Sequence, residues 1–98
     1  MIDERDIERK LGEAVRDYGG LCVKLDSGTK KGVQDRLVLL PGGRVYFVET
    51  KKPEGGRLSE FQKVRRVQMR RMGFPALVVS NQTELAAFVQ SWENKEAE

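Results

Sequence analysis

Histidine is absent from this sequence, and cysteine occurs once, as Cys22. The chain therefore has neither an internal disulfide framework nor the Cys/His ligand sets that hold structural zinc, which fits a reducing cytoplasm. Long hydrophobic runs are missing too. The longest strongly apolar stretches, residues 36–40 and 45–48, have the length of strands, and the first residues are charged. The sequence thus predicts neither a membrane segment nor an export signal.

What is present suffices for one small domain. The 98 residues are 39% hydrophobic, which supports a single compact core but not two. We expect this domain to span residues 1–92, followed by a polar tail, residues 93–98, that is too hydrophilic to pack and is expected to be disordered. The formal net charge of +3 is compatible with a polyanionic partner but does not identify one.

Hydrophobic periodicity and turn residues predict three helices and four strands. The helices are indicated by the spacing of Ile7, Leu11 and Val15, by the capping-box pair Ser59 and Gln62, and by an apolar face of Leu85, Phe88, Val89 and Trp92. Strands are predicted over residues 21–25, 36–40, 44–51 and 76–79, and residues 41–43, Pro-Gly-Gly, join the middle two as a β-hairpin. The resulting order, αβββαβα, is that of an α/β domain.

The hairpin places two acidic residues opposite each other. If residues 41–43 form a three-residue loop, Leu40 faces Arg44, and counting outward sets Asp35 opposite Glu49. A bulge in the loop would make the pair diagonal but leave both near one ion. Like charges so placed destabilise a sheet unless a cation offsets them.

Lys51 shares the face of Glu49, because strand residues two apart project together, whereas Thr50 offers this face only its backbone carbonyl. Phosphodiester hydrolysis needs an oxygen-ligated magnesium ion and a positioned cation, and these residues supply both parts. A plainer interpretation is a solvated strand edge with a weak ion pair, and from spacing alone the two interpretations are about equally good.

Two further side chains are candidates for the same site. Glu8 lies at the border of the apolar stripe of the first helix, where it could reach a site formed against the sheet or merely complement the helix dipole, and we favour it over Glu4. Gln62 could act from the second helix or serve as the capping partner of Ser59.

The second helix is predicted to turn Phe61, Val64 and Met72 toward the core and a basic stripe toward solvent. Such stripes are usually only solvated. Beside a hydrolytic site, however, a set of basic residues could follow a nucleic-acid backbone. The candidates are Lys30, Lys31, Arg36, Lys52, Arg57, Lys63, Arg66 and Arg70.

Taken together, three segments resemble the VRR-NUC family of virus-type replication-repair nucleases. They are residues 32–36, Gly-Val-Gln-Asp-Arg; residues 48–51, Val-Glu-Thr-Lys; and residues 55–59, Gly-Gly-Arg-Leu-Ser, followed by Gln62. The resemblance covers nearly the whole chain. It implies a minimal restriction-endonuclease-like PD-(D/E)XK fold with a mixed central sheet flanked by helices. Gln34 departs from the proline usual in the family, but this position carries no catalytic atom.

The resemblance also implies roles for the candidate residues. Asp35 and Glu49 would bind Mg²⁺ or Mn²⁺ with the Thr50 carbonyl, Lys51 would orient the attacking water, Glu8 would complete the site, and Gln62 would steady it. It further implies a homodimer that acts on branched DNA such as four-way (Holliday) junctions, in the cytoplasm of a bacterial or phage-infected host cell. Symmetric cleavage of a junction needs two active sites in fixed relation.

The sequence therefore predicts a metal-dependent deoxyribonuclease acting as an endonuclease. One alternative is a DNA-binding module that keeps the nuclease fold and has lost the chemistry, which salt-sensitive binding without metal-dependent nicking would indicate. Another is a small interaction protein whose hairpin acids pair only with neighbouring lysines, and this predicts no metal binding.

Overall fold

A computed structural model describes residues 3–25, 35–51 and 57–93. Along the chain it contains α1 (Glu4–Asp17), β1 (Leu21–Lys24), β2 (Arg36–Leu40), β3 (Arg44–Thr50), α2 (Glu60–Arg71), β4 (Ala76–Val79) and α3 (Gln82–Glu93). This is the predicted αβββαβα order. Of the predicted tail, only Glu93 is described, at the end of α3; residues 94–98 lie outside the described part of the chain.

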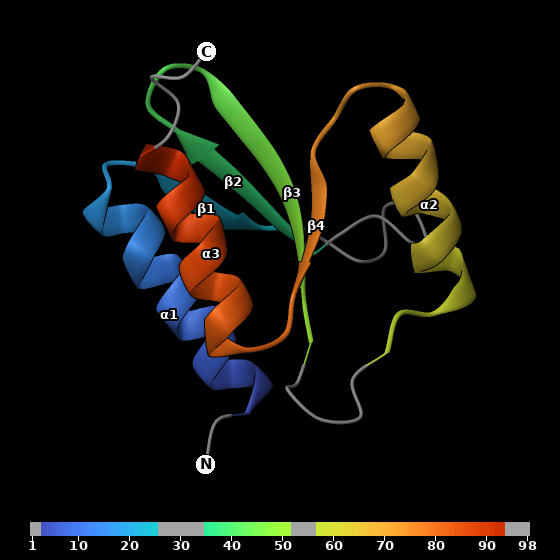
Figure 1. The fold of residues 1–98 in the computed structure, drawn as a ribbon, viewed down its shortest axis with the longest axis horizontal. Coiled ribbons are helices and arrows are strands. Elements are labelled where there is room, and N and C mark those ends of the chain that lie inside the picture. The colour runs from blue at the N-terminus through green and yellow to red at the C-terminus, as the bar shows by residue number, and fades with distance from the viewer. Residues whose placement is uncertain (1–2, 26–34, 52–56, 94–98) are drawn as a thin grey trace.

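The strands form one mixed sheet in the order β1-β2-β3-β4. β1, β2 and β3 pair antiparallel, whereas β4 joins β3 in parallel after the crossover through α2. Helices α1 and α3 lie together on one side of this sheet, and α2 lies on the other side, next to β4 (Figure 1). The fold is therefore α/β, with a mixed sheet that has helices on both faces, as predicted.

The core fills the space between the sheet and the pair α1 and α3. The apolar stripe Ile7, Leu11 and Val15 is fully buried, and it packs with Val48 of β3 and Trp92 of α3. Trp92 also meets the ring of Phe88 edge to face at a centroid distance of 5.2 Å. The predicted inner faces of α1 and α3 are thus confirmed, and they fix both helices against the central strands.

The N-termini of α1 and α2 are both capped by side chains. Asp3 caps α1 in a capping box with Asp6, and Ser59 caps α2 in a capping box with Gln62. Between α1 and β1, Gly20 runs so close to β2 that an added Cβ would lie 2.4 Å from the carbonyl oxygen of Leu39. A glycine is therefore required where the chain enters the sheet.

None of the helices in residues 3–25, 35–51 and 57–93 is long and apolar enough to cross a membrane.

Candidate active site

The hairpin of β2 and β3 brings two carboxylates to one end of the sheet. Its ladder pairs Leu40 with Arg44 and, at the far end, Arg36 with Val48. This is the register expected from a three-residue turn, and continuing it by one residue sets Asp35 opposite Glu49. Both side chains are withdrawn from solvent, with exposed fractions of 26% for Asp35 and 7% for Glu49.

Each carboxylate keeps one oxygen without a hydrogen bond. Within the described residues, the buried atoms Asp35 Oδ1 and Glu49 Oε1 have no partner. A buried carboxylate oxygen in this state is unfavourable unless a proton or a cation satisfies it. Two carboxylate oxygens are hard ligands of the kind that Mg²⁺ and Mn²⁺ prefer, so the side chains present fit such an ion.

Electrostatics give the same indication. Burial raises the pKa of Glu49 to about 7, with the charge of Asp35 as the second cause and the Lys51 ammonium as a partial offset. Burial also raises the pKa of Asp35, against the lowering effects of the Arg36 guanidinium and of a backbone hydrogen bond from Thr50. Without a cation, therefore, holding a negative charge on both carboxyl groups at neutral pH is unfavourable.

Lys51 lies beside this pair, as predicted. Its Nζ atom is 3.6 Å from Glu49 Oε2, and its side chain is 21% exposed. Lys51 directly follows β3, and its backbone N–H donates to the Val79 carbonyl of β4 at 3.1 Å. The backbone below the ammonium is thus held by the sheet, while the ammonium itself keeps access to solvent.

Glu8 reaches the carboxylate pair only through an arginine. Arg36 is 8% exposed, and its guanidinium lies 2.7 Å from Glu8 Oε2 and 3.2 Å from Asp35 Oδ2. No group of three or more His, Cys, Asp or Glu side chains in the described segments is close enough to hold a metal ion. Glu8 thus contacts Asp35 through Arg36, and its role as a metal ligand stays a prediction.

Arg36 itself was predicted to contact nucleic acid. It is buried between two carboxylates, and its contact with nucleic acid stays a prediction. The sequence contained a signal for this burial: an arginine next to Asp35 in a strand must point to the opposite face, where α1 packs. Thr50 is likewise fully buried on that opposite face, so only its backbone is available to the site.

Gln62 adopts the structural alternative. Its Oε1 accepts the Ser59 backbone N–H at 2.8 Å, and its own backbone N–H donates to Ser59 Oγ at 3.1 Å. In this rotamer the side-chain oxygen caps α2, and a role at the carboxylate pair requires a different rotamer.

The predicted orientation of α2 is wrong. Phe61, Val64 and Met72 are all more than half exposed, and the buried residue of this helix is Met69. On the side of α2 toward β4, Met69 is buried, and Arg66 Nε and Arg70 Nη1 donate to the carbonyl oxygen of Ala76 at 3.2 and 3.3 Å. These contacts satisfy that carbonyl from the side of the helix that was predicted to face solvent.

Two of the remaining basic candidates lie in the described part of the chain. Arg57 is exposed, and Lys63 is exposed with its Nζ 3.5 Å from Glu60 Oε1. Lys30, Lys31 and Lys52 lie outside the described residues. Nucleic-acid contact by these residues stays a prediction.

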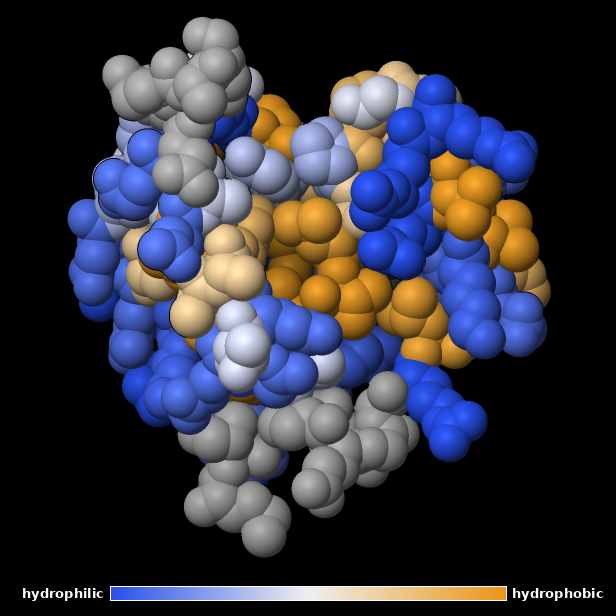
Figure 2. All heavy atoms as spheres, in the orientation of Figure 1, coloured by the Kyte–Doolittle hydropathy of each residue, from blue (hydrophilic) through white to orange (hydrophobic). Residues whose placement is uncertain are grey.

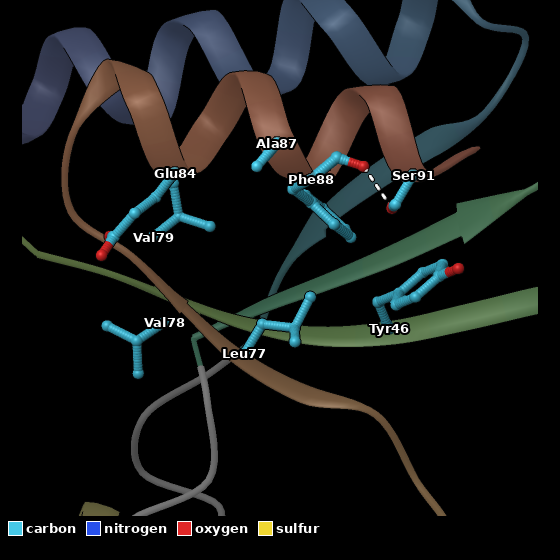
Figure 3. Close-up of a pocket in the computed structure, with 8 residues that line it drawn as sticks. All are labelled: Tyr46, Leu77, Val78, Val79, Glu84, Ala87, Phe88 and Ser91. Carbon is cyan, nitrogen blue, oxygen red and sulfur yellow. Dashed lines mark hydrogen bonds between the residues drawn. The ribbon is translucent and has the colours of Figure 1, made fainter. Parts of the chain in front are cut away.

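A hollow of about 370 Å³ between α3 and β4 lies apart from the carboxylate pair. Figure 3 shows Tyr46 and Leu77 pointing from the sheet toward Phe88 of α3, while Val78 points away. The carboxylate among its lining residues, Glu84, already accepts hydrogen bonds from Ser80 through the backbone N–H and the hydroxyl, both at 2.8 Å. This hollow therefore has no pair of groups poised for chemistry.

A mixed sheet in αβββαβα order, with two carboxylates and a lysine at the end of its central hairpin, defines the chain as a nuclease of the PD-(D/E)XK type. No family model matches the sequence. A curated phage protein does: the chain is 37% identical over 82 residues to the protein named "Putative nuclease p44" of Acyrthosiphon pisum secondary endosymbiont phage 1, covering 84% of this chain and 87% of that one.

A solved structure described as "VRR_NUC domain" superposes with a TM-score of 0.82 at 29% identity, covering 89% of this chain and 94% of that one. The chain therefore belongs to the VRR-NUC family of nucleases.

Proposed function

We propose that this protein is a Mg²⁺- or Mn²⁺-dependent endonuclease that hydrolyses phosphodiester bonds in branched or structured DNA, such as four-way junctions. The observation that carries the proposal is the buried pair of Asp35 and Glu49. Each of the two has a carboxylate oxygen without a hydrogen-bond partner, and Lys51 lies beside them. Burial next to Asp35, which raises the pKa of Glu49 to about 7, indicates a site that gains from a cation.

Asp35 and Glu49, with the backbone carbonyl of Thr50, are the residues that would hold the ion. When bound, the ion would supply positive charge to the phosphate and make a bound water more acidic. The Lys51 ammonium can donate a hydrogen bond to the attacking water or to a phosphate oxygen, and the sheet fixes the backbone from which it projects.

Arg36 contributes by holding Asp35 in place. Its two contacts connect Asp35 of the hairpin to Glu8 of α1. Glu8 thus contributes to the site through its ion pair with Arg36. This arrangement also explains why a buried arginine is tolerated here, because both of its charged contacts are carboxylates.

Size and charge support the proposed substrate and assembly. A chain of 98 residues covers little of a DNA duplex, and symmetric incision of a junction requires two centres in fixed relation, so we propose that the enzyme acts as a homodimer. Arg57 and Lys63 are exposed and available for phosphate contacts, which would make binding salt-sensitive. The expected place of action is the cytoplasm of a bacterial or phage-infected cell.

The test is cleavage of labelled four-way junction, flap, single-stranded and linear duplex DNA in the presence of Mg²⁺, Mn²⁺ or EDTA. Wild type is compared with Asp35→Ala, and Asp17→Ala, which removes an exposed aspartate at the end of α1, is the matched control. We expect cutting that needs the metal ion, is lost in Asp35→Ala and is unchanged in Asp17→Ala.

Lys51→Ala examines the second part of the site. This variant should bind metal and DNA but fail to cut, while Lys24→Ala, which removes an exposed lysine of β1, should cut normally. A folded wild type that binds DNA without cutting under any metal condition would replace the proposal by the DNA-binding module. Full activity of Lys51→Ala would remove the lysine from the mechanism.

A further inference from the structure

Each carboxylate of the candidate site is paired with one basic side chain. The Arg36 guanidinium lies 3.2 Å from Asp35 Oδ2, and Lys51 Nζ lies 3.6 Å from Glu49 Oε2. The two oxygens that remain, Asp35 Oδ1 and Glu49 Oε1, are buried and have no hydrogen-bond partner within the described residues. Each carboxylate therefore has one oxygen available to an ion, while its other oxygen already lies beside a positive charge.

Of the two basic side chains, Arg36 is held more firmly. It is 8% exposed, and its Nη2 donates to Glu8 Oε2 of α1 at 2.7 Å. Its Nη1 donates to the Asp35 backbone carbonyl at 3.3 Å and also lies against the Asp35 carboxylate. A planar guanidinium held on both sides can release Asp35 Oδ2 only by breaking these contacts. Asp35 Oδ2 is therefore kept from an ion, and Asp35 Oδ1 is presented to it.

The number of oxygens that a carboxylate gives affects which ion fits a site. Mg²⁺ requires nearly octahedral geometry and is held by carboxylates together with several waters, whereas the larger Ca²⁺ takes about six to eight oxygens and accepts both oxygens of one carboxylate. Carboxylates restricted to one oxygen each thus suit Mg²⁺ and the similarly six-coordinate Mn²⁺. A carboxylate free to give both oxygens favours Ca²⁺.

We propose that Arg36 is a positioning residue that sets the ion preference of the site. By holding Asp35 Oδ2, it restricts Asp35 to one ligand oxygen and so disfavours Ca²⁺ relative to Mg²⁺ and Mn²⁺. Glu8 takes part by anchoring Arg36 from α1. The inference rests on the proposed function for the presence of an ion, and it adds the feature of the chain that selects which ion binds.

A simple counter-charge role for Arg36 has a different consequence. Mg²⁺, Mn²⁺ and Ca²⁺ carry the same charge, so a change in the charge near the site alters the affinity for all of them by a similar factor. The ratio of two affinities changes only when the geometry or the number of the ligand oxygens changes. This ratio is therefore the quantity that distinguishes positioning from neutralisation.

The hollow between α3 and β4 does not compete for the ion. Figure 2 shows apolar side chains gathered over β4, between α3 and α2. Glu84 is the one carboxylate among the residues that line the hollow, and it already accepts two hydrogen bonds from Ser80. Metal binding to the DNA-free protein should therefore report on the pair of Asp35 and Glu49.

The test is calorimetric titration of the DNA-free protein with Mn²⁺ alone, followed by competition with Ca²⁺ and with Mg²⁺. Arg36→Lys keeps the charge but replaces the planar fork by one ammonium group, which does not reproduce the contacts to both Glu8 and Asp35. We expect the affinity for Ca²⁺ relative to Mn²⁺ to rise roughly 10-fold or more, as is typical when a residue behind a metal ligand is changed. Arg44→Lys, at the turn end of the hairpin, makes the same replacement and should leave the ratio unchanged.

A second variant keeps Arg36 itself and does not depend on the folding of Arg36→Lys. Glu8→Gln removes the anchor of Arg36 at a side chain that is 27% exposed. The ratio should shift in the same direction by a smaller factor, and Glu8→Gln should add nothing to the shift caused by Arg36→Lys. A Glu8→Gln variant that loses affinity for all three ions equally, with an unchanged ratio, would overturn the anchoring of Arg36 by Glu8.

Infrared difference spectra measure the binding mode directly. The antisymmetric and symmetric stretches of a carboxylate lie closer together when both oxygens bind one ion than when a single oxygen does. Ca²⁺ should therefore produce the wider splitting in wild type and the narrower splitting in Arg36→Lys. The proposal is overturned if the narrower splitting is already present in wild type, or if folded Arg36→Lys changes neither the splitting nor the affinity ratio.

Failure of this inference and failure of the proposed function are distinguishable. A protein that shows the Arg36-dependent ion preference but cuts no DNA would keep the inference and remove the nuclease activity. A metal-dependent nuclease whose affinity ratio is the same in Arg36→Lys would do the reverse. Wild type that binds none of the three ions, with or without DNA, would overturn both.

Discussion

Glu49 is placed where its charge opposes folding, and we predict that removing this charge stabilises the metal-free protein. In the folded chain, burial and Asp35 raise the pKa of Glu49 from 4.5 to about 7. A carboxyl group with a raised pKa binds more protons when folded than when unfolded at intermediate pH, so stability must fall as the pH rises. The stabilisation from protonated Glu49 is fully present below pH 4.5 and is lost as the pH passes about 7.

The size of the effect follows from the same shift. A difference of about 2.5 pKa units at roughly 1.4 kcal/mol per unit makes ionised Glu49 unfavourable by about 3 kcal/mol at pH 8. Glutamine has nearly the same shape and no charge. Glu49→Gln should therefore raise the melting temperature of the metal-free protein at pH 8 by roughly 10–20 °C, since about 1 kcal/mol corresponds to 4–8 °C in a domain of this size.

The assay is thermal unfolding in EDTA at several pH values between 4.5 and 8.5, at one fixed protein concentration. The gap between Glu49→Gln and wild type should close toward pH 4.5, and Glu13→Gln, at a half-exposed position of α1, should show no such gap. Added Mg²⁺ should stabilise wild type far more than the variant, which has lost a ligand. The reasoning is refuted if Glu49→Gln is less stable than wild type at pH 8 in EDTA.

Three further predictions concern neighbouring parts of the molecule. Arg36→Ala should lower stability by about 3 kcal/mol or more and weaken Mg²⁺ binding in calorimetry, because it leaves two partly buried carboxylates without their counter-charge; unchanged metal affinity would contradict its positioning role. Lys51→Ala should lower the single-turnover cleavage rate roughly 100-fold or more with little change in DNA affinity. Gly20→Ala should destabilise by about 1–3 kcal/mol in urea unfolding, because its Cβ would collide with the Leu39 carbonyl oxygen, whereas Gly12→Ala, in open space on α1, should stabilise by roughly 0.5–1 kcal/mol; equal effects of the two alanines would refute this contrast.

The central part of the site was accessible from the sequence because it depends on local geometry. A three-residue Pro-Gly-Gly turn fixes the register of the hairpin, and strand alternation then fixes which side chains share a face. Asp35, Glu49 and Lys51 could therefore be placed without knowing how the helices pack. The buried stripe of α1 was also predictable from local geometry, because side chains three, four and seven residues apart lie on the same face of a helix.

The orientation of α2 was not accessible in this way. Its sequence contains an apolar stripe and a basic stripe, and periodicity alone favours burying the apolar one. In the folded chain a single carbonyl at Ala76 accepts hydrogen bonds from Arg66 and Arg70, and the helix covers only the edge of the sheet. This acceptor belongs to a different element, β4, so no helical wheel of α2 contains it.

The sequence by itself determined the elements, the hairpin register and the identity of the paired carboxylates, because these follow from covalent geometry over a few residues. Only the tertiary structure decided that Arg36 connects Glu8 to Asp35, residues that come from separate elements of the chain, and that the apolar face of α2 remains outside. Both outcomes arise from competition between surfaces that meet only when the helices dock, and the energy of such contacts is not encoded in any local pattern.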